Sequence, residues 1–235
     1  MKDMTFVDHF EELRFRLLKS LFFIILFSIL GYIYSDKTIS LLINQVFLNE
    51  LIEFQVLKIT SIFLVKIGVA ISTGLFISFP FILYQFLRFI LPAFQNKLTS
   101  FKIILITILS IILFLLGLFF GYYIIIPFSI SFFLNLSAGL DFVNLNYTLE
   151  GYLVYLIWIL IISSMIFQMP LLIIILSRIG IVSYDFLSEK RRFIVVGLFI
   201  FSAILTPPDP ASQIIVVISL YILFELSLFI IKIFK

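Results

Sequence analysis

The sequence predicts an all-α integral membrane protein with six transmembrane helices and both termini on the cytoplasmic or matrix side. Of its 235 residues, 63% are hydrophobic and 12% are charged, whereas soluble domains carry about 25% charged residues. Long apolar runs recur along the chain, and a helix needs about 20 such residues to cross a bilayer. Basic residues collect in alternate connections between the runs, as the positive-inside rule describes. We therefore expect one polytopic membrane domain over residues 1–235.

The first element, residues 1–16, is expected to be an amphipathic helical arm at the membrane interface. Thr5 and Asp8 resemble a capping box, and Glu12 and Arg16 are four residues apart, so they can pair along a helix. The arm serves either as a simple anchor or as a surface that presents carboxylates to a cationic partner. The carboxylates in question are those of Asp8, Glu11 and Glu12.

Six apolar runs follow this arm, and each is expected to be a span. They lie near residues 17–34, 62–91, 103–126, 152–176, 193–205 and 211–231. Of the 16 Lys and Arg residues, 13 lie toward one side, in or next to the arm, the alternate connections and the C-terminus, while the opposite loops are acidic. This asymmetry places both termini inside.

The fifth run is unusually short for a span. Residues 193–205 form a helix of roughly 20 Å, whereas the hydrocarbon core is about 30 Å thick. The run leads into a turn containing Pro207 and Pro208, through which no helix can continue. We therefore expect a hairpin of short fifth and sixth helices.

Prolines within or at the ends of the longer runs are expected to kink those helices and so to build a concave arrangement. These are Pro80, Pro127 and Pro170. Small residues are expected to permit close helix packing, as they do in other membrane proteins. These are Gly31, Gly117, Gly121 and Gly197.

Polar side chains at membrane depth are costly and are therefore functional candidates. Lys66 can snorkel or pair with an acid. Glu225 has two open interpretations, an acid satisfied by packing or a group with a proton or substrate role. The other candidates are Gln168, Asp209 and Gln213.

The composition argues against several classes of function. There is no Cys and only 1 His, so iron–sulfur clusters, Cys-ligated zinc, bis-histidine haem and Ser-His-Asp catalysis are not expected. We expect no metal, no cofactor and no enzymatic activity. The net charge of +3 is too small to favour nucleic acid as a partner.

Blocks of sequence carry a family resemblance, in order from near the start to near the end of the chain. They are His9-Phe-Glu-Glu12-Leu-Arg14-Phe-Arg16, Pro80-Phe-Ile-Leu-Tyr84-Gln85, Phe89-Ile-Leu-Pro92, Phe167-Gln168-Met-Pro170, Leu205-Thr-Pro-Pro208-Asp209-Pro-Ala-Ser-Gln213 and Tyr221-Ile-Leu-Phe224-Glu225. Together they resemble TatC, the multispanning receptor subunit of the twin-arginine (Sec-independent) protein translocase.

The resemblance implies a receptor for folded proteins whose signal peptides carry two adjacent arginines. It implies single-span partners of the TatA/TatB type, a homo- or hetero-oligomeric complex in the bilayer and use of the protonmotive force. The implied signal-peptide surface comprises Glu12 and Phe89, with Glu11, Arg14 and Arg16 close by. Gln168, Asp209, Gln213 and Glu225 match polar membrane positions, some of which contact partners or the inserted signal. Leu98 stands where the family usually has a Glu that also contacts the twin arginines.

Other functions and several compartments stay open at this point. The alternatives are a secondary transporter, an ion-conducting membrane protein, or an assembly or scaffold subunit without twin-arginine selectivity. A composition rich in Phe, Ile, Leu, Asn and Lys is typical of an A+T-rich genome and suggests an organelle-encoded member. The Thr206-Pro207-Pro208-Asp209 form resembles bacterial and mitochondrial members of the family more than plastid ones, which favours the mitochondrial inner membrane. The bacterial plasma membrane and the plastid thylakoid are the alternatives.

Overall fold

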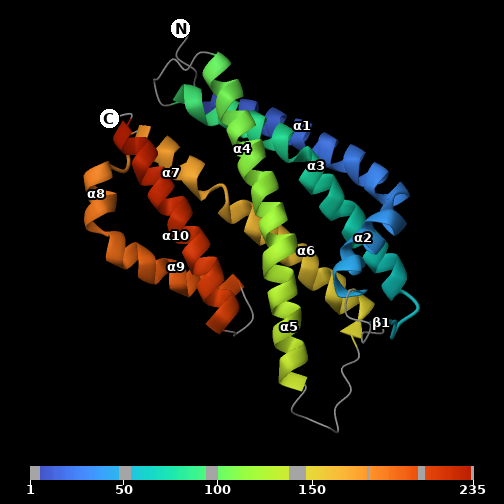
Figure 1. Ribbon diagram of the computed structural model, residues 1–235. Helices are drawn as coiled ribbons and strands as arrows, with labels where there is room; N and C mark the ends of the chain where they lie inside the picture. The colour runs from blue at the N-terminus through green and yellow to red at the C-terminus, as the bar shows by residue number, and fades with distance from the viewer. Residues whose placement is uncertain are drawn as a thin grey trace. The chain divides into compact units, whose positions relative to one another are not determined.

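The computed structural model describes residues 6–47, 54–93, 100–137, 147–178, 180–205 and 210–233, and it is helical almost throughout (Figure 1). The helices are α1 (Phe6–Ile33), α2 (Ser35–Phe47), α3 (Ser61–Ala93), α4 (Ser100–Phe120), α5 (Ile126–Ser137), α6 (Leu149–Ile166), α7 (Met169–Arg178), α8 (Tyr184–Glu189), α9 (Arg191–Leu205) and α10 (Pro210–Ile233). A π-helical turn, η1 (Gly121–Ile125), joins α4 to α5, and strands β1 (Phe54–Gln55) and β2 (Tyr147–Thr148) pair with each other. Leu98, Pro207, Pro208 and Asp209 lie outside the described residues.

Five segments of the described chain are long and apolar enough to cross a membrane, which confirms the predicted all-α membrane class. They are Phe10–Ile33, Ser61–Phe89, Ile104–Asn135, Leu149–Arg178 and Gln213–Ile233. Helix α9 has 15 residues, or about 22 Å at 1.5 Å per residue. The fifth predicted helix is therefore short, as expected, and five long segments plus α9 are consistent with six spans. The inside location of the termini and the concave arrangement stay predictions.

The chain forms two compact units, which are described separately. The first comprises residues 1–44, 56–111 and 148–154, and the second comprises residues 45–55, 112–147 and 155–235.

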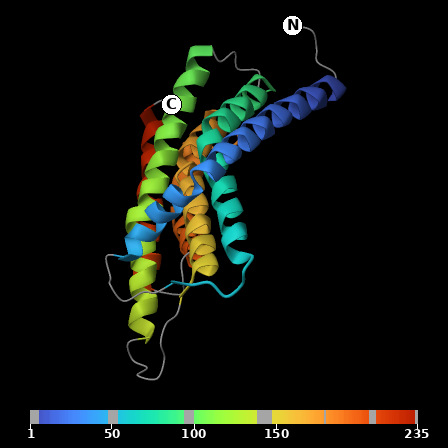
Figure 2. The ribbon, with the colours of Figure 1, turned by 90° about the vertical axis from the view of Figure 1, so that its right-hand side faces the viewer.

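In the first unit, α1 and α3 lie side by side as an antiparallel pair (Figures 1 and 2). A Cβ added at Gly31 would lie 2.8 Å from the Ala70 carbonyl oxygen, so the backbones meet closely there. Further along, Phe23 of α1 stacks on Phe81 of α3 with ring centroids 4.3 Å apart. Later residues of α3 thus contact earlier residues of α1, as in an antiparallel pair, and these contacts define the register of the two helices.

The arm and the first span form a single helix rather than two segments. Helix α1 runs for 28 residues without a break, so residues 6–16 continue the axis of the span. Helix α2 follows at once, where the sequence predicted only a loop. Its first turn contains Asp36, whose Oδ1 lies 2.7 Å from Lys66 Nζ on α3. The expectation that Lys66 snorkels or pairs with an acid is thus met by an ion pair.

The third predicted helix is longer than expected, because Pro127 does not end it. The residues on either side of Pro127 belong to α5, and the apolar segment continues to Asn135. Immediately before the proline, η1 widens the helix, and the Ile126 N–H donates to the Gly121 carbonyl oxygen, five residues back. Such a turn accommodates a residue that lacks an N–H and carries a bulky ring. The predicted end at residue 126 is therefore wrong.

The three prolines behave differently, although the sequence predicted a kink at each. Helix α3 runs through Pro80 for 33 residues. In the fourth predicted span, by contrast, α6 ends at Ile166 and α7 begins at Met169, so the helix breaks beside Pro170. The missing N–H of Pro170 explains this interruption.

The second unit has an apolar core where α7, α8 and α10 meet. Its buried members are Ile173, Leu187, Phe224, Leu228 and Ile231. Helix α10 has 24 residues, about 36 Å, so the expectation of a short sixth helix is wrong. Pro210 occupies the first position of α10, where a missing N–H costs nothing, and it therefore starts the helix instead of shortening it.

Candidate functional site

The candidate site lies where the N-terminal half of α1 meets the C-terminal end of α3, within the first unit. Both helices are longer than a bilayer requires, at 28 and 33 residues. Their register brings Arg16 of α1 next to Gln85 of α3, 69 residues later in the chain. The positive-inside pattern predicts that this end of the pair lies on the inner side of the membrane.

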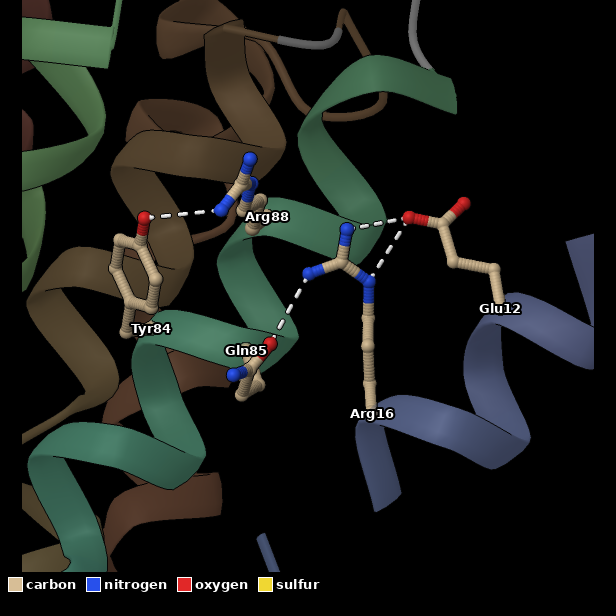
Figure 3. A network of polar contacts seen from close by, with 5 residues as sticks. All are labelled: Glu12, Arg16, Tyr84, Gln85 and Arg88. Atoms are coloured by element: carbon tan, nitrogen blue, oxygen red, sulfur yellow. Dashed lines mark hydrogen bonds and ion pairs between the residues drawn. The ribbon is translucent and has the colours of Figure 1, made fainter. Parts of the chain in front are cut away.

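Arg16 is the centre of the polar network in Figure 3. Its Nε donates to Glu12 Oε1 at 2.9 Å, and its Nη2 donates to the same oxygen. Its Nη1 donates to Gln85 Oε1 at 3.1 Å. The Arg16 side chain is 16% exposed and that of Glu12 is 30% exposed. The carboxylate is therefore held by one oxygen at a partly buried site, and Oε2 points away from Arg16 (Figure 3).

A second pair lies on α3 on either side of Gln85 in the sequence. Arg88 Nη1 donates to the Tyr84 hydroxyl oxygen at 3.3 Å, and the Arg88 guanidinium lies 6.0 Å from the centroid of the Tyr84 ring. Arg88 is exposed, and Tyr84 is half-buried. Tyr84 thus engages Arg88, and Glu12 engages Arg16 (Figure 3).

The structure brings Glu12 and Arg16 together, as their spacing predicted. Glu11 and Arg14 lie on α1 beside them with exposed side chains, and Phe89 is half-buried on α3. Sequence reasoning missed three members of this surface as site residues. They are Tyr84, Gln85 and Arg88. Tyr84 and Gln85 stood in the Pro80–Gln85 block, which is the signal that could have found them.

The charge balance of this surface is slightly positive. Its described carboxylates are those of Glu11 and Glu12. They are outnumbered by the guanidiniums of Arg14, Arg16 and Arg88. A cationic ligand therefore gains little from the overall charge of the surface, and its recognition requires directed hydrogen bonds.

Glu225 lies in a separate polar cluster in the second unit. Its Oε2 lies 3.3 Å from Arg191 Nη2 of α9, and its Oε1 accepts a hydrogen bond of 3.0 Å from the Tyr221 hydroxyl. Both carboxylate oxygens are thus engaged. Of the two interpretations of Glu225, the structure favours an acid satisfied by packing.

Gln213 is also engaged within the second unit, where it links α9 to α10. Its side-chain Nε2 donates to the Phe199 backbone carbonyl oxygen at 3.2 Å, and the Gln213 backbone carbonyl oxygen accepts from Ser202 Oγ at 2.9 Å. These bonds hold the start of α10 against α9.

Gln168 lines an apolar cavity of about 610 Å³ formed by the α6–α7 break, α9 and α10. Gly197 lines the same cavity, and a Cβ added there would meet nothing within 4 Å. The expectation that Gly197 permits close helix packing is therefore wrong. It is right for Gly117, where an added Cβ would lie 2.6 Å from Ser164 Cα, and for Gly121, where it would lie 2.3 Å from Ser163 Oγ.

Comparison with known proteins identifies the family. The family model described as Sec-independent protein translocase protein (TatC) matches residues 8–218. A Sec-independent protein translocase protein TatC of Carboxydothermus hydrogenoformans is 31% identical over 235 residues, covering 100% of this chain and 95% of the relative. An uncharacterized tatC-like protein of Reclinomonas americana, ymf16, is 34% identical over 237 residues, covering 99% of this chain and 89% of the relative.

The fold also matches a solved structure. A crystal structure of the twin arginine translocase receptor TatC in DDM superposes with a TM-score of 0.81 at 28% identity, covering 95% of this chain and 99% of that chain. Because the family model spans most of the chain and the structural match spans nearly all of it, the chain belongs to the TatC family of Sec-independent protein translocase proteins.

Proposed function

We propose that this translocase subunit is the receptor for twin-arginine signal peptides and that the Glu12 carboxylate binds one guanidinium of the arginine pair. The observation that carries the proposal is the geometry of Glu12. Its carboxylate is held by Arg16 where the N-terminal half of α1 meets the C-terminal end of α3, and Oε2 points away from Arg16 (Figure 3). A planar guanidinium with paired N–H donors suits such a carboxylate better than the point charge of an ammonium does.

Phe89 extends this proposed surface along α3. It follows Gln85 by one turn on the same helix face, and its side chain is half-buried. The apolar part of a signal peptide is expected to contact this end of α3, while the arginines reach Glu12. Leu98, which stands where the family usually has a second Glu, leaves Glu12 to bind the arginines without that carboxylate.

The experiment compares the binding of two peptides by the purified full chain in lipid nanodiscs. One is a signal peptide with its arginine pair, and the other has both arginines replaced by lysine. For Glu12→Gln we expect twin-arginine affinity to fall at least tenfold, because a hydrogen bond to a charged group contributes about 1.5–3 kcal/mol. Glu189→Gln is the matched control, since Glu189 is an exposed carboxylate on α8.

Unchanged binding by Glu12→Gln would remove Glu12 from the site. Equal affinity of the wild-type chain for both peptides would instead favour a scaffold subunit without twin-arginine selectivity.

We further propose that α9 and α10 recruit single-span partners of the TatA/TatB type into a complex driven by the protonmotive force. Support comes from the exposed apolar face of α9, which includes Phe193, Val196 and Ile200. Asp209 and Gln213 are the proposed polar contacts at the outer end of this hairpin.

The mitochondrial inner membrane is the proposed location, supported by a composition with 31 Phe that is typical of an A+T-rich genome. Finding the coding sequence in a mitochondrial genome is the direct test of that location.

A further inference from the structure

Gln85 is the only group on α3 with a hydrogen bond in the described structure to the Arg16–Glu12 pair. Two N–H groups of Arg16 donate to a single oxygen of Glu12, and a third donates to Gln85 Oε1 at 3.1 Å. The guanidinium is planar and rigid, so a bond on one edge restricts the direction of the bonds on the other. Gln85 therefore determines the plane in which Arg16 meets Glu12.

This contact limits how the Glu12 carboxylate can turn. A Glu side chain on a helix surface ordinarily samples several rotamers, and an exposed i,i+4 pair with Arg contributes only about 0.3–0.5 kcal/mol. Here the Arg16 side chain is 16% exposed and is anchored to the neighbouring helix as well. The carboxylate is thereby held with Oε1 occupied by Arg16 and Oε2 directed away from Arg16 (Figure 3).

The orientation of the carboxylate matters because arginine and lysine use it differently. A guanidinium donates from a fixed fork, so its affinity depends on the direction of the acceptor oxygen. An ammonium is a compact charge with rotatable donors, and it binds a turning carboxylate nearly as well as a fixed one. A carboxylate that is held in place therefore discriminates between the two cations, whereas a mobile one attracts both.

The charge of the surface strengthens this argument. Among the side chains that the structure describes here, the guanidiniums of Arg14, Arg16 and Arg88 outnumber the carboxylates of Glu11 and Glu12, so long-range attraction adds little for either cation. Discrimination has to come from short, directed bonds.

We propose that Gln85 is a positioning residue which, through Arg16, makes the Glu12 carboxylate selective for arginine over lysine in the ligand. The inference rests on the proposed function, since it takes Glu12 as the acceptor of the signal peptide.

The test measures the ratio of the affinities for the twin-arginine and twin-lysine peptides in nanodiscs. Gln85→Met removes the acceptor with little change of volume, and we expect the ratio to fall about fivefold, or about 1 kcal/mol at 1.4 kcal/mol per factor of ten. The fall should come from weaker arginine binding, with lysine binding unchanged. Gln55→Met, the same substitution at an exposed position in β1, should leave the ratio unchanged.

Arg16→Lys provides a second route to the same measurement if Gln85→Met folds poorly. It keeps the charge but loses the planar fork, so the ratio should fall here too. An unchanged ratio in folded Gln85→Met or in Arg16→Lys overturns the inference.

The failure of this inference can be distinguished from failure of the proposed function. If Glu12→Gln lowers twin-arginine affinity at least tenfold while Gln85→Met keeps the full ratio, only the role of Gln85 is lost. If Glu12→Gln leaves binding intact, the proposed site itself is wrong and the inference falls with it.

Discussion

Gly74 is the position at which a single methyl group should most directly disturb the α1–α3 pair. A Cβ added there would lie 2.1 Å from Ser28 Oγ, 2.7 Å from the Ser28 backbone nitrogen and 2.8 Å from the Ile24 carbonyl oxygen. The hydroxyl can rotate away, but the two backbone atoms belong to α1 and move only with the helix. Gly74→Ala must therefore force the helices apart.

The expected cost is about 1–3 kcal/mol, the range for adding a methylene to a packed interior. Alanine is the better helix former by about 0.8–1 kcal/mol, which offsets part of the loss. For a chain of this length, each kcal/mol shifts the midpoint of thermal unfolding by about 2–4 °C. We expect the midpoint of Gly74→Ala to fall by several degrees when it is followed by circular dichroism in detergent.

Gly68→Ala is the matched control on the same helix. A Cβ added at Gly68 meets nothing within 4 Å, so only the gain in helix propensity applies and the midpoint should hold or rise. Ser28→Ala, combined with Gly74→Ala, should restore only part of the loss, because the backbone contacts remain. A midpoint for Gly74→Ala equal to or above that of Gly68→Ala would refute the packing argument.

Three further predictions concern α9, α10 and the turn between them. Gly197→Leu should be tolerated or should raise the midpoint of thermal unfolding, since its side chain enters the apolar cavity of about 610 Å³; a marked fall in the midpoint would contradict the cavity. Glu225→Gln should lower the free energy of unfolding by at most about 1 kcal/mol, because the pair with Arg191 is partly exposed. Because the two side chains pair, the double variant Arg191→Gln with Glu225→Gln should be no less stable than Glu225→Gln alone. A loss of stability equal to the sum of the two single losses would argue against the pairing. Asp209→Ala should impair transport while sparing signal-peptide binding, as measured by reconstituted transport and by peptide affinity; loss of binding would count against the predicted topology.

Local patterns in the sequence predicted most helices but not all of their ends. The apolar runs located every long segment, because burial in lipid depends on composition over about 20 residues. The end at residue 126 was wrong because the rule that proline stops a helix takes no account of a π-helical turn such as η1. The short sixth helix was wrong for a related reason, since Pro210 begins α10.

Whether the contacts of a side chain could be predicted depended on how far away its partner lies in the sequence. The Glu12–Arg16 pair was foreseeable because four residues on one helix bring two side chains together. Glu225 was identified as a candidate, but its partner Arg191 lies on a different helix, so its two interpretations could not be separated. Gly197 was misassigned for the same reason, because a glycine at a helix contact and a glycine beside a cavity look identical in sequence.

Composition, the spacing of apolar runs and the distribution of basic residues established a polytopic helical membrane protein, and ordered sequence blocks indicated its family. These are properties of single segments, and each can be read from a window of the chain. The contact between Arg16 and Gln85 is different, since it joins residues 69 positions apart. It exists because Gly31 and Gly74 let α1 and α3 approach closely in one register. That register, set by steric fit along two helices, is what brings the network around Glu12 together.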